Sequence, residues 1–456
     1  MSTPHYIGAV LVLGLISAVG YFSGRRIKSA DDFTVGGRRA GAGIVAGALI
    51  GTLVGGASTI GTAQLAFNYG FSAWWFTLGG GLGCLALAVF FSRRVYESGI
   101  STMPQIFARE YGRRSSTAVT LLSSLGSFLS VVSQMLSGLA LAGAAAHLGH
   151  AAGTILVAAL MMCYVVFGGV WGAGYVGLVK TILLYGGVGL CGLLALKAQG
   201  GPAAFQAALP AERYFNLVAQ GPVKDLGAGL SLVLGVLTTQ AYIQAMISAR
   251  SLRVSRLGIL ISAALIPLVG VAGIFVGMYM KLRHPDIASA AALPLFIMEQ
   301  LPPLLGGAIL ATLLVTVVGT GAGVSLGLSA MFCNDIYKVY LRKNPTDRQS
   351  LLVSRLTIVV ILAAAALFAS GNLGSLILSW SFLSMGLRGA AAFAPMCAAL
   401  FLPGRIRAEF ALASIVAGPL FVLAGKFTLP ASFDPLFIGV AASAVILGLG
   451  YKSSRS

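Results

Sequence analysis

The chain consists almost entirely of apolar runs long enough to cross a membrane. A helix of about 20 apolar residues spans the ~30 Å hydrocarbon core of a bilayer. The predicted spans are 6–24, 42–70, 73–92, 117–145, 152–170, 173–196, 226–249, 257–280, 304–332, 351–370, 373–402, 408–425 and 434–451. Charged residues make up only 9% of the chain, against about 25% in soluble proteins. The sequence therefore predicts an all-α polytopic membrane protein with about thirteen transmembrane helices.

The positive charges alternate between the two sides of this predicted bundle. The loops on one side hold 22 of the 30 Lys and Arg residues, and those on the other side hold six. The positive-inside rule assigns the basic side to the cytoplasm. This predicts a multi-pass protein of the plasma (inner) membrane, with its N-terminus outside and its C-terminus cytoplasmic.

The net charge of +18 is spread over many loops rather than gathered in one patch, so no nucleic acid is expected as a partner. The expected partners are the lipid bilayer and a small-molecule solute, with no obligatory protein partner.

Two predicted spans carry weak helix formers or polar groups at their centres. Small or hydroxylated residues occupy 55–59 in the second span, and polar residues occupy 238–240 and Gln244 in the seventh. Interrupted segments at matching positions of two halves are typical of inverted-repeat transporters that bind their solute near the midplane. Two ordinary helices that happen to contain glycine are the alternative.

These interruptions divide the chain into two sets of five spans, each opening on a broken helix. The predicted organisation is an N-terminal extra helix with a cytoplasmic loop (1–41), a first inverted repeat of five helices (42–197), an extracellular loop (198–225), a second inverted repeat of five helices (226–402) and two C-terminal helices (403–456).

The sequence lacks the marks of an enzyme or of an ATP-driven pump. It contains no G-x-x-x-x-G-K-[ST] phosphate loop, and no Ser/His/Asp, metal-ligand or paired-carboxylate set lies within the spans. We therefore expect no enzymatic activity, no cofactor and no metal, apart from Na⁺ or H⁺ as a coupling ion. A channel and a transporter-like sensor are the alternatives to a secondary transporter. A channel would need a continuous pore, and a sensor would need a signalling domain.

Polar side chains predicted to face the interior are the candidates for solute binding. In the fourth span, Ser123, Ser127, Ser130, Gln134 and Ser137 recur every three or four residues, which places them on one helix face. Such a stripe either lines a solute path or holds helices together. The candidate solute-binding residues are Ser58, Thr59, Gln134, Thr239, Gln240, Gln244 and Arg388.

Two cations, Lys180 and Arg388, lie within predicted spans, whereas no Asp or Glu lies in the middle of any span. Guanidinium groups bind carboxylate or phosphate oxygens through paired hydrogen bonds, although Arg388 could instead tie unwound backbone carbonyls together. An electropositive interior favours an anionic or carboxylate-bearing solute.

Four short motifs are similar to those of the sodium:solute symporter family. They are Ser-Ala-Asp-Asp-Phe-Thr-Val-Gly-Gly-Arg at 29–38, Gly-Gly-Ala-Ser at 55–58, Gly-Gly-Val-Trp at 168–171 and Asn-Asp-Ile-Tyr-Lys at 334–338. The resemblance implies the five-plus-five inverted-repeat fold of the bacterial leucine transporter. It also implies sodium-coupled secondary transport by alternating access.

The resemblance further implies a sodium site between the second and ninth spans. Its ligands would be the carbonyls of Ala57, Ile60 and Thr316, with hydroxyls at the positions of Gly319 and Thr320. This chain departs from the pattern, because glycine has no side-chain oxygen. In the sixth span, the family's Thr-Asp-x-x-Gln is replaced by Val-Gly-Leu-Val-Lys at 176–180, so the acidic residue is missing.

We therefore expect the Lys180 ammonium, or its proton, to take the place of Na⁺ on the carbonyls of the broken helix. An unpaired charge at the bilayer centre costs at least ~2.5–3.5 kcal/mol, and burial without a carboxylate favours release of the proton. Proton-coupled or sodium-independent transport would follow. The alternatives are a lysine that snorkels to the surface and a true Na⁺-coupled symporter with an intact site. The candidate ion-coupling residues are Ala57, Ile60, Lys180, Thr316, Gly319 and Thr320.

Overall fold

The computed structural model describes residues 2–24, 38–100, 102–146, 148–342, 345–430 and 432–452, with the side chains of 20, 23–24, 146 and 165–175 left out. Its elements are α1 (Thr3–Gly24), α3 (Ala42–Leu53), η2 (Ala57–Gly61), α4 (Thr62–Tyr69), η3 (Gly70–Trp74), α5 (Trp75–Ala86), η4 (Leu87–Phe91), α6 (Ser92–Glu97), α7 (Pro104–Tyr111), α8 (Arg113–Ala146), α9 (His150–Gln199), α10 (Pro202–Ala208), α11 (Ala211–Tyr214), α12 (Pro222–Thr238), α13 (Gln240–Ile247), α14 (Leu252–Arg283), η5 (Ser289–Ala291), α15 (Ala292–Gln300), α16 (Pro303–Met331), η6 (Phe332–Leu341), α17 (Asp347–Ser370), α18 (Ile377–Phe401), α19 (Ala408–Thr428) and α20 (Leu436–Leu449). The described ranges contain helices and two isolated β-bridges but no strand. The predicted all-α class is confirmed.

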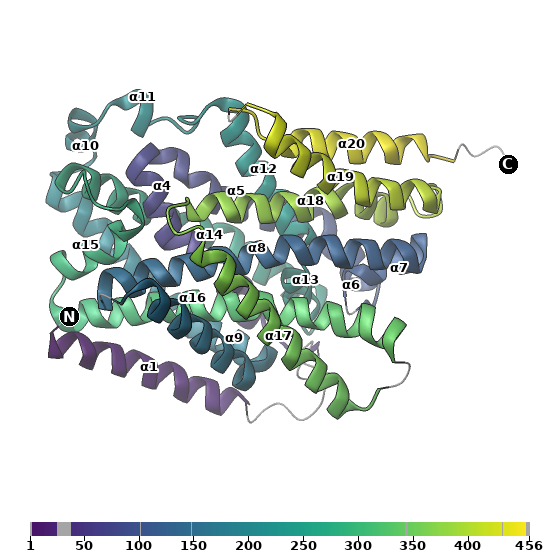
Figure 1. Cartoon of the computed structure of the whole chain (residues 1–456), viewed down its shortest axis with the longest axis horizontal. Coiled ribbons are helices and arrows are strands. Elements are labelled where there is room, and N and C mark those ends of the chain that lie inside the picture. The colour runs from purple at the N-terminus through teal and green to yellow at the C-terminus, as the bar shows by residue number, and fades with distance from the viewer. Residues whose placement is uncertain are drawn as a thin grey trace.

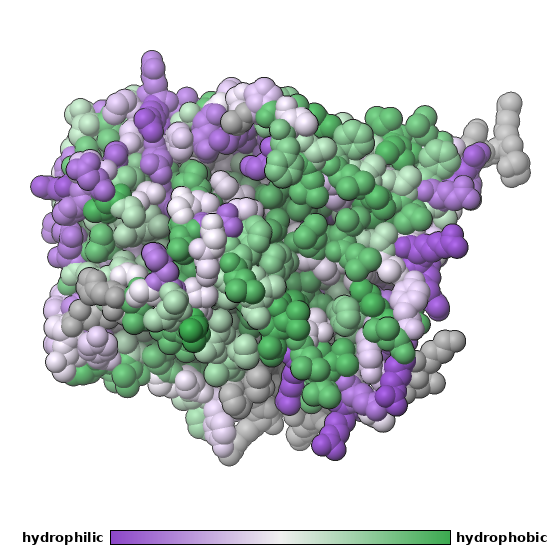
Figure 2. Space-filling model, in the orientation of Figure 1, coloured by the Kyte–Doolittle hydropathy of each residue, from purple (hydrophilic) through white to green (hydrophobic). Residues whose placement is uncertain are grey.

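The long helices run between two ends of the molecule, and the N- and C-termini lie at opposite ends (Figure 1). Hydrophobic side chains cover the middle of the face shown in Figure 2, and hydrophilic side chains gather toward the two ends. Large apolar residues on the outside, such as Leu367 and Phe427, are exposed. A bundle with an apolar belt between polar ends is the arrangement that a bilayer requires.

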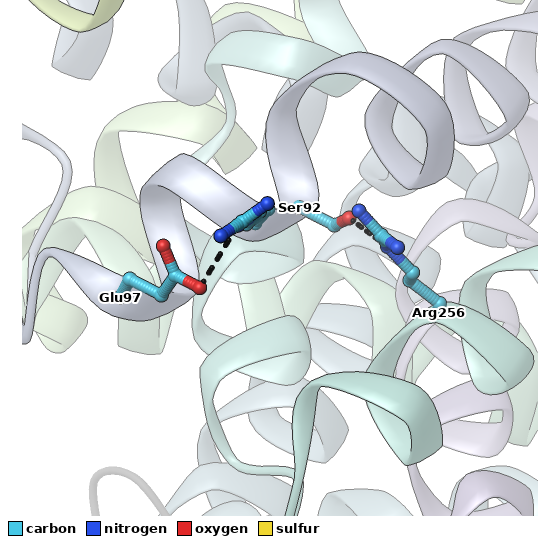
Figure 3. A network of polar contacts seen from close by, with 4 residues as sticks. Ser92, Glu97 and Arg256 are labelled. Carbon is cyan, nitrogen blue, oxygen red and sulfur yellow. Dashed lines mark hydrogen bonds and ion pairs between the residues drawn. The ribbon is translucent and has the colours of Figure 1, made fainter.

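Basic loops that are distant in sequence gather at the end that holds the C-terminus. Arg94 lies over the ring of Phe401 at 4.0 Å, and the Lys452 amide donates to the Arg405 carbonyl at 2.7 Å. Figure 3 shows Arg256 reaching the Ser92 hydroxyl at 3.0 Å, beside the exposed ion pair of Glu97 with Arg93 at 3.1 Å. We call this region, formed by 92–100, 102–114, 249–256, 401–407 and 450–452, the basic end. The loops predicted to share one side of the membrane thus lie together.

The apolar helices of the described residues differ in length. In the described residues, eight helices are long and apolar enough to cross a membrane, or nine when a bent pair counts as one span. Four shorter apolar helices accompany them: Thr3–Val19, Ala42–Leu53, His150–Tyr164 and Leu436–Leu449. The predicted number of thirteen is therefore not confirmed.

The helix α9 contains 50 residues and covers the predicted spans 152–170 and 173–196. A Cβ atom at Gly319 would lie 3.3 Å from the Tyr164 hydroxyl oxygen and 3.8 Å from the Lys180 ammonium nitrogen. In a straight helix the Cα atoms of Tyr164 and Lys180 would be ~24 Å apart, which is more than their two side chains can bridge. The helix α9 is therefore bent between Tyr164 and Lys180, where the two predicted spans meet.

Both predicted interruptions are present in the structure. The helix α3 ends at Leu53, Val54 is extended (φ −86°, ψ 92°), and the chain resumes at the π-helical turn η2. In the second half, Thr239 is extended (φ −90°, ψ 123°) and α12 and α13 meet at 49°. Each interruption frees backbone groups that lipid cannot satisfy. Side chains from other helices must therefore bond to them.

Candidate solute and ion site

Buried side chains bond to the backbone freed at the first interruption. The amide of Gly56 donates to Gln134 Oε1 on α8 at 2.8 Å. The Ser58 hydroxyl donates to the Leu53 carbonyl at 3.0 Å, and the Thr59 hydroxyl donates to a carbonyl within the interruption at 3.0 Å. All of these side chains are buried, so the interruption faces protein and not hydrocarbon.

Glycine is required at this interruption because helix α8 approaches closely. A Cβ atom at Gly56 would lie 2.2 Å from the Cβ atom of Ser137 and 2.9 Å from a methyl group of Val317. A Cβ atom at Gly55 would lie 2.6 Å from Gln134 Oε1 and 2.9 Å from the Cβ atom of Thr320. The two glycines therefore bring α8 and α16 against the interrupted backbone.

Lys180 holds one of the freed carbonyls. Its ammonium donates to the Gly51 carbonyl at 2.5 Å and lies 3.4 Å from the Thr320 hydroxyl, which donates to the same carbonyl at 3.1 Å. In an unbroken helix this carbonyl would accept from the amide of Gly55. The Lys180 residue is only 2% exposed, so the structure agrees with the expected contact to the broken helix and not with snorkelling.

Of the other residues of the predicted ion site, some lie beside Lys180 and others bond within their own helix. Gly319 faces the Lys180 ammonium and Tyr164, so the lysine lies beside the position where a hydroxyl is missing. The Thr316 hydroxyl bonds within α16, to the Thr312 carbonyl at 2.7 Å. Ala57 and Ile60 both belong to η2. The Ala57 carbonyl accepts from the Thr62 hydroxyl at 3.2 Å. Ile60 is buried. The structure thus gathers Lys180, Gly319 and Thr320 around the Gly51 carbonyl.

Arg388 binds the second interruption. This residue is 1% exposed, and its guanidinium donates to the hydroxyls of Thr239 at 2.8 Å, Ser130 at 3.0 Å and Ser384 at 2.9 Å. It also donates to the Ser384 carbonyl at 3.2 Å and lies 3.2 Å from the sulfur of Met385. All of these partners are neutral. Arg388 therefore joins α18, α8 and the interrupted α12–α13 pair through hydroxyl groups and one carbonyl of its own helix.

The two predicted glutamines of the second interruption lie on α13, after the extended Thr239. Gln240 Oε1 accepts from the amide of Met103 at 2.7 Å, in the loop before α7 at the basic end. Gln244 lies one turn further along α13 and is partly exposed. The structure therefore places these two predicted solute-binding residues on the basic-end side of the interruption.

One face of α8 connects both interruptions. All five residues of the predicted polar stripe are buried. Within it, Ser130 contacts Arg388 and Gln134 contacts Gly56, and these two residues are one helical turn apart, a rise of ~6 Å. The residues around the interruptions therefore form one polar centre rather than two separate sites.

Sequence reasoning missed several residues of this polar centre. The Ser133 hydroxyl bonds to the Ser381 hydroxyl at 2.6 Å, and Ser384 bonds to both Ser130 and the Gly126 carbonyl. The sequence does contain a pattern that could have predicted them. Ser381, Ser384 and Arg388 are spaced by three and four residues, so they share one helix face.

A cavity of about 260 Å³ lies at the end opposite the basic end, between α12, α18, α19 and α20. Its lining includes the ammonium-bearing residues Lys224 and Lys426, the carboxylate of Asp434, and Ser231, Ser379 and Phe382. Burial raises the pKa of Asp434 above its usual value, against the opposing influence of its backbone hydrogen bond and the two lysines. The cavity is therefore positively charged at neutral pH.

The broken helices around a buried polar centre, within an all-helical membrane bundle, define a transporter of the inverted-repeat type. The sequence profile of the sodium:solute symporter family matches residues 33–418. The chain belongs to this family, and it is a transporter and not an enzyme.

Comparisons with individual proteins agree with this assignment. The chain is 22% identical over 394 residues to the uncharacterized symporter YwcA of Bacillus subtilis (strain 168), covering 81% of this chain and 75% of that protein. Its fold is similar to that of a Na⁺-coupled sialic acid symporter in a substrate-bound outward-open state, with a TM-score of 0.82, 19% identity and full coverage of both chains. It is also similar to Mhp1, a nucleobase-cation-symport-1 family transporter, with a TM-score of 0.61, 13% identity and coverage of 93% and 95%. At these identities the structural likenesses show the fold alone.

Proposed function

We propose that this secondary transporter moves a small carboxylate-bearing solute across the plasma membrane by alternating access, with the Lys180 proton in place of a sodium ion. Transport is then proton-coupled or independent of sodium. The observation that carries this proposal is the contact of the buried Lys180 ammonium with the Gly51 carbonyl at the first interruption. The basic end faces the cytoplasm in this proposal, as the positive-inside rule requires.

The protonation of Lys180 provides a mechanism for coupling. A protonated amine makes a charge-assisted hydrogen bond, which is roughly twice as strong as a neutral one. It therefore holds α3 against α16, because Gly51 and Thr320 belong to these two helices. A neutral amine binds the carbonyl more weakly and lets the two helices separate more easily. Loading and release of one proton thus shifts the balance between two conformations.

The charges around the polar centre support a carboxylate as the solute. Arg388 is fully buried and its described partners are all neutral. Its Nη1 atom carries two N–H donors, of which one has a described acceptor, Thr239. The positively charged cavity at the opposite end, with Lys224 and Lys426, would attract anions toward the bundle.

The test is uptake by proteoliposomes that contain the purified protein. A thermal-shift screen of organic acids and amino acids identifies a solute, and uptake of this solute is then measured with Na⁺ replaced by choline and with an imposed pH gradient. We expect uptake to persist in choline and to respond to the gradient. Strict dependence on Na⁺ would reject the role of Lys180 and favour a Na⁺-coupled symporter.

A further inference from the structure

The cavity at the end opposite the basic end has a charged mouth and an apolar floor. Among the described residues that line it, the charged ones are Lys224, Lys426 and Asp434, and all three are at least partly exposed to solvent. Leu378 and Leu436 line it from buried positions. Its volume of about 260 Å³ lies just below the ~300–1,000 Å³ of pockets that hold drug-sized ligands. The cavity therefore has room for a small molecule with one charged group and an apolar body.

Asp434 lies against the first two turns of α12. Its Oδ1 atom accepts from the amide of Leu436 at 2.9 Å, which fixes the carboxyl group at the start of α20. A Cβ atom at Gly227 would lie 2.7 Å from Asp434 Oδ2, so the glycine makes room for this oxygen. Lys224 precedes Gly227 by three residues and lies on the same helix face. Lys224 and Asp434 therefore line the same side of the cavity.

Lys426 approaches the same carboxylate from α19. It follows Gly425, where a Cβ atom would lie 2.8 Å from the Cβ atom of Pro435, the residue after Asp434. Burial raises the pKa of Asp434, and its backbone hydrogen bond, Lys426 and Lys224 lower it, so both ammonium groups lie near the carboxylate. The ion pairs among the described residues lie elsewhere, at 93–97 and 284–299. Two positive charges and one negative charge therefore line the mouth without pairing, and they leave it with a net charge of +1.

The floor of the cavity is closed toward the polar centre. Ser231 of α12 and Gly386 of α18 line this floor and are buried. Beyond them the two helices are in close contact, because a Cβ atom at Gly235 would lie 2.5 Å from the sulfur of Met385. Arg388 is two residues after Gly386 and so faces a different side of α18. The cavity and the polar centre are therefore separate places in the fold.

We propose that this cavity is a second binding site, which takes a small carboxylate with a compact apolar body. The carboxylate lies between the ammonium groups of Lys224 and Lys426, and the apolar body fills the floor. A monoanion matches the net charge of the mouth and leaves it neutral, whereas a cation is repelled. Asp434 repels the second charge of a dianion such as phosphate.

The apolar floor distinguishes this site from a patch of surface lysines. An ion pair between exposed groups is weak in water, so the two lysines alone hold an anion poorly. Removal of an apolar ring from water supplies the further affinity. A carboxylate that carries a ring should therefore bind more tightly than acetate does.

The site lies on helices that carry the second interruption. The helix α12 ends beside the extended Thr239, and α18 carries Arg388. A ligand between Lys224 and Lys426 joins α12 to α19, so it favours the conformation in which these helices are close together. The bound carboxylate need not be transported, and in this respect the inference goes beyond the proposed function.

The experiment measures binding to the full-length protein in detergent by isothermal titration calorimetry. The probes are benzoate, its neutral counterpart benzamide, and acetate, which has a carboxylate but no ring. The cavity variants are Lys224→Gln and Lys426→Gln. Their matched control is Lys197→Gln, because Lys197 is exposed and does not line the cavity. Arg388→Gln reports on binding at the polar centre.

We expect saturable binding of benzoate, with acetate and benzamide each at least about tenfold weaker. Each cavity variant should weaken benzoate binding about fivefold or more, and Lys197→Gln should not change it. Arg388→Gln should retain a benzoate site that depends on the two lysines. Absence of saturable benzoate binding would overturn the proposal. Unchanged binding in both cavity variants, with loss in Arg388→Gln, would also overturn it, because the carboxylate would then lie at the polar centre.

A further variant alters the floor and keeps every charge. Ala228 lines the cavity and is buried, so Ala228→Leu fills part of the floor and should weaken binding of benzoate more than that of acetate. Equal benzoate binding by Ala228→Leu and the wild-type protein would overturn the assigned position of the ring. Because calorimetry involves no transport, failure of carboxylate uptake would reject the proposed function without affecting this result.

Discussion

Replacement of Lys180 by methionine tests the proposed coupling most directly. Methionine keeps an unbranched apolar chain in the buried position but donates no hydrogen bond. The Gly51 carbonyl would still accept from the Thr320 hydroxyl at 3.1 Å, so the change removes one charged donor without orphaning an acceptor. A hydrogen bond to a charged group contributes about 1.5–3 kcal/mol. This corresponds to a change of about 10- to 150-fold in the equilibrium constant between two conformations, one with α3 held against α16 and one with the two helices separated.

The assay is solute uptake by proteoliposomes from mildly acidic to mildly alkaline pH, with and without Na⁺. Wild-type uptake should vary with pH and not with Na⁺, and uptake by Lys180→Met should lose its pH dependence. Lys197→Met is the matched control, because Lys197 is an exposed residue near the end of the same helix α9. A Lys180→Met protein that retains the wild-type pH profile would refute the reasoning, as would a wild-type protein that requires Na⁺.

Three further variants test other parts of the polar centre. Arg388→Gln should abolish uptake of a carboxylate and lower the free energy of unfolding by about 1–3 kcal/mol, and retained uptake would remove Arg388 from the solute site. Gly56→Ala should destabilise by about 1–3 kcal/mol in denaturant unfolding, because its Cβ atom would lie 2.2 Å from Ser137. The control Gly323→Ala, whose Cβ atom meets nothing within 4 Å, should be neutral or slightly stabilising. Gly319→Ser combined with Lys180→Gln replaces an ammonium by a hydroxyl and should make uptake dependent on Na⁺; unchanged Na⁺-independent uptake would contradict the predicted position of the ion.

The features that sequence could predict are those set by local chemistry. Runs of apolar residues predict membrane helices because lipid satisfies no backbone group. The glycines at 55 and 56 predict an interruption because they are poor helix formers, and the structure shows in addition that α8 leaves no room for a Cβ atom. The sequence placed Lys180 and Arg388 within spans but left snorkelling open for Lys180, and the structure shows that both side chains are buried.

The features that sequence could not predict are those decided by packing between distant segments. Gln240 is a predicted solute-binding residue, and the structure adds a contact that the sequence does not reveal, because the amide of Met103 in the loop before α7 donates to its side chain. Ser133 was not part of the predicted stripe, and its partner Ser381 is 248 residues away.

In the proposed function, the two buried cations link solute binding to the protonation of Lys180. Lys180 contacts the Gly51 carbonyl and Arg388 contacts Ser130, while Gln134, one turn from Ser130 on α8, contacts Gly56 at the first interruption. Charges of the same sign repel more strongly in a protein interior than in water, because the effective dielectric constant is lower. A carboxylate bound at Arg388 neutralises one charge and so favours the protonated form of Lys180. Linkage is reciprocal, so protonation of Lys180 strengthens solute binding by the same factor. The charges therefore favour movement of solute and proton in the same direction, because each ligand stabilises the state that binds the other.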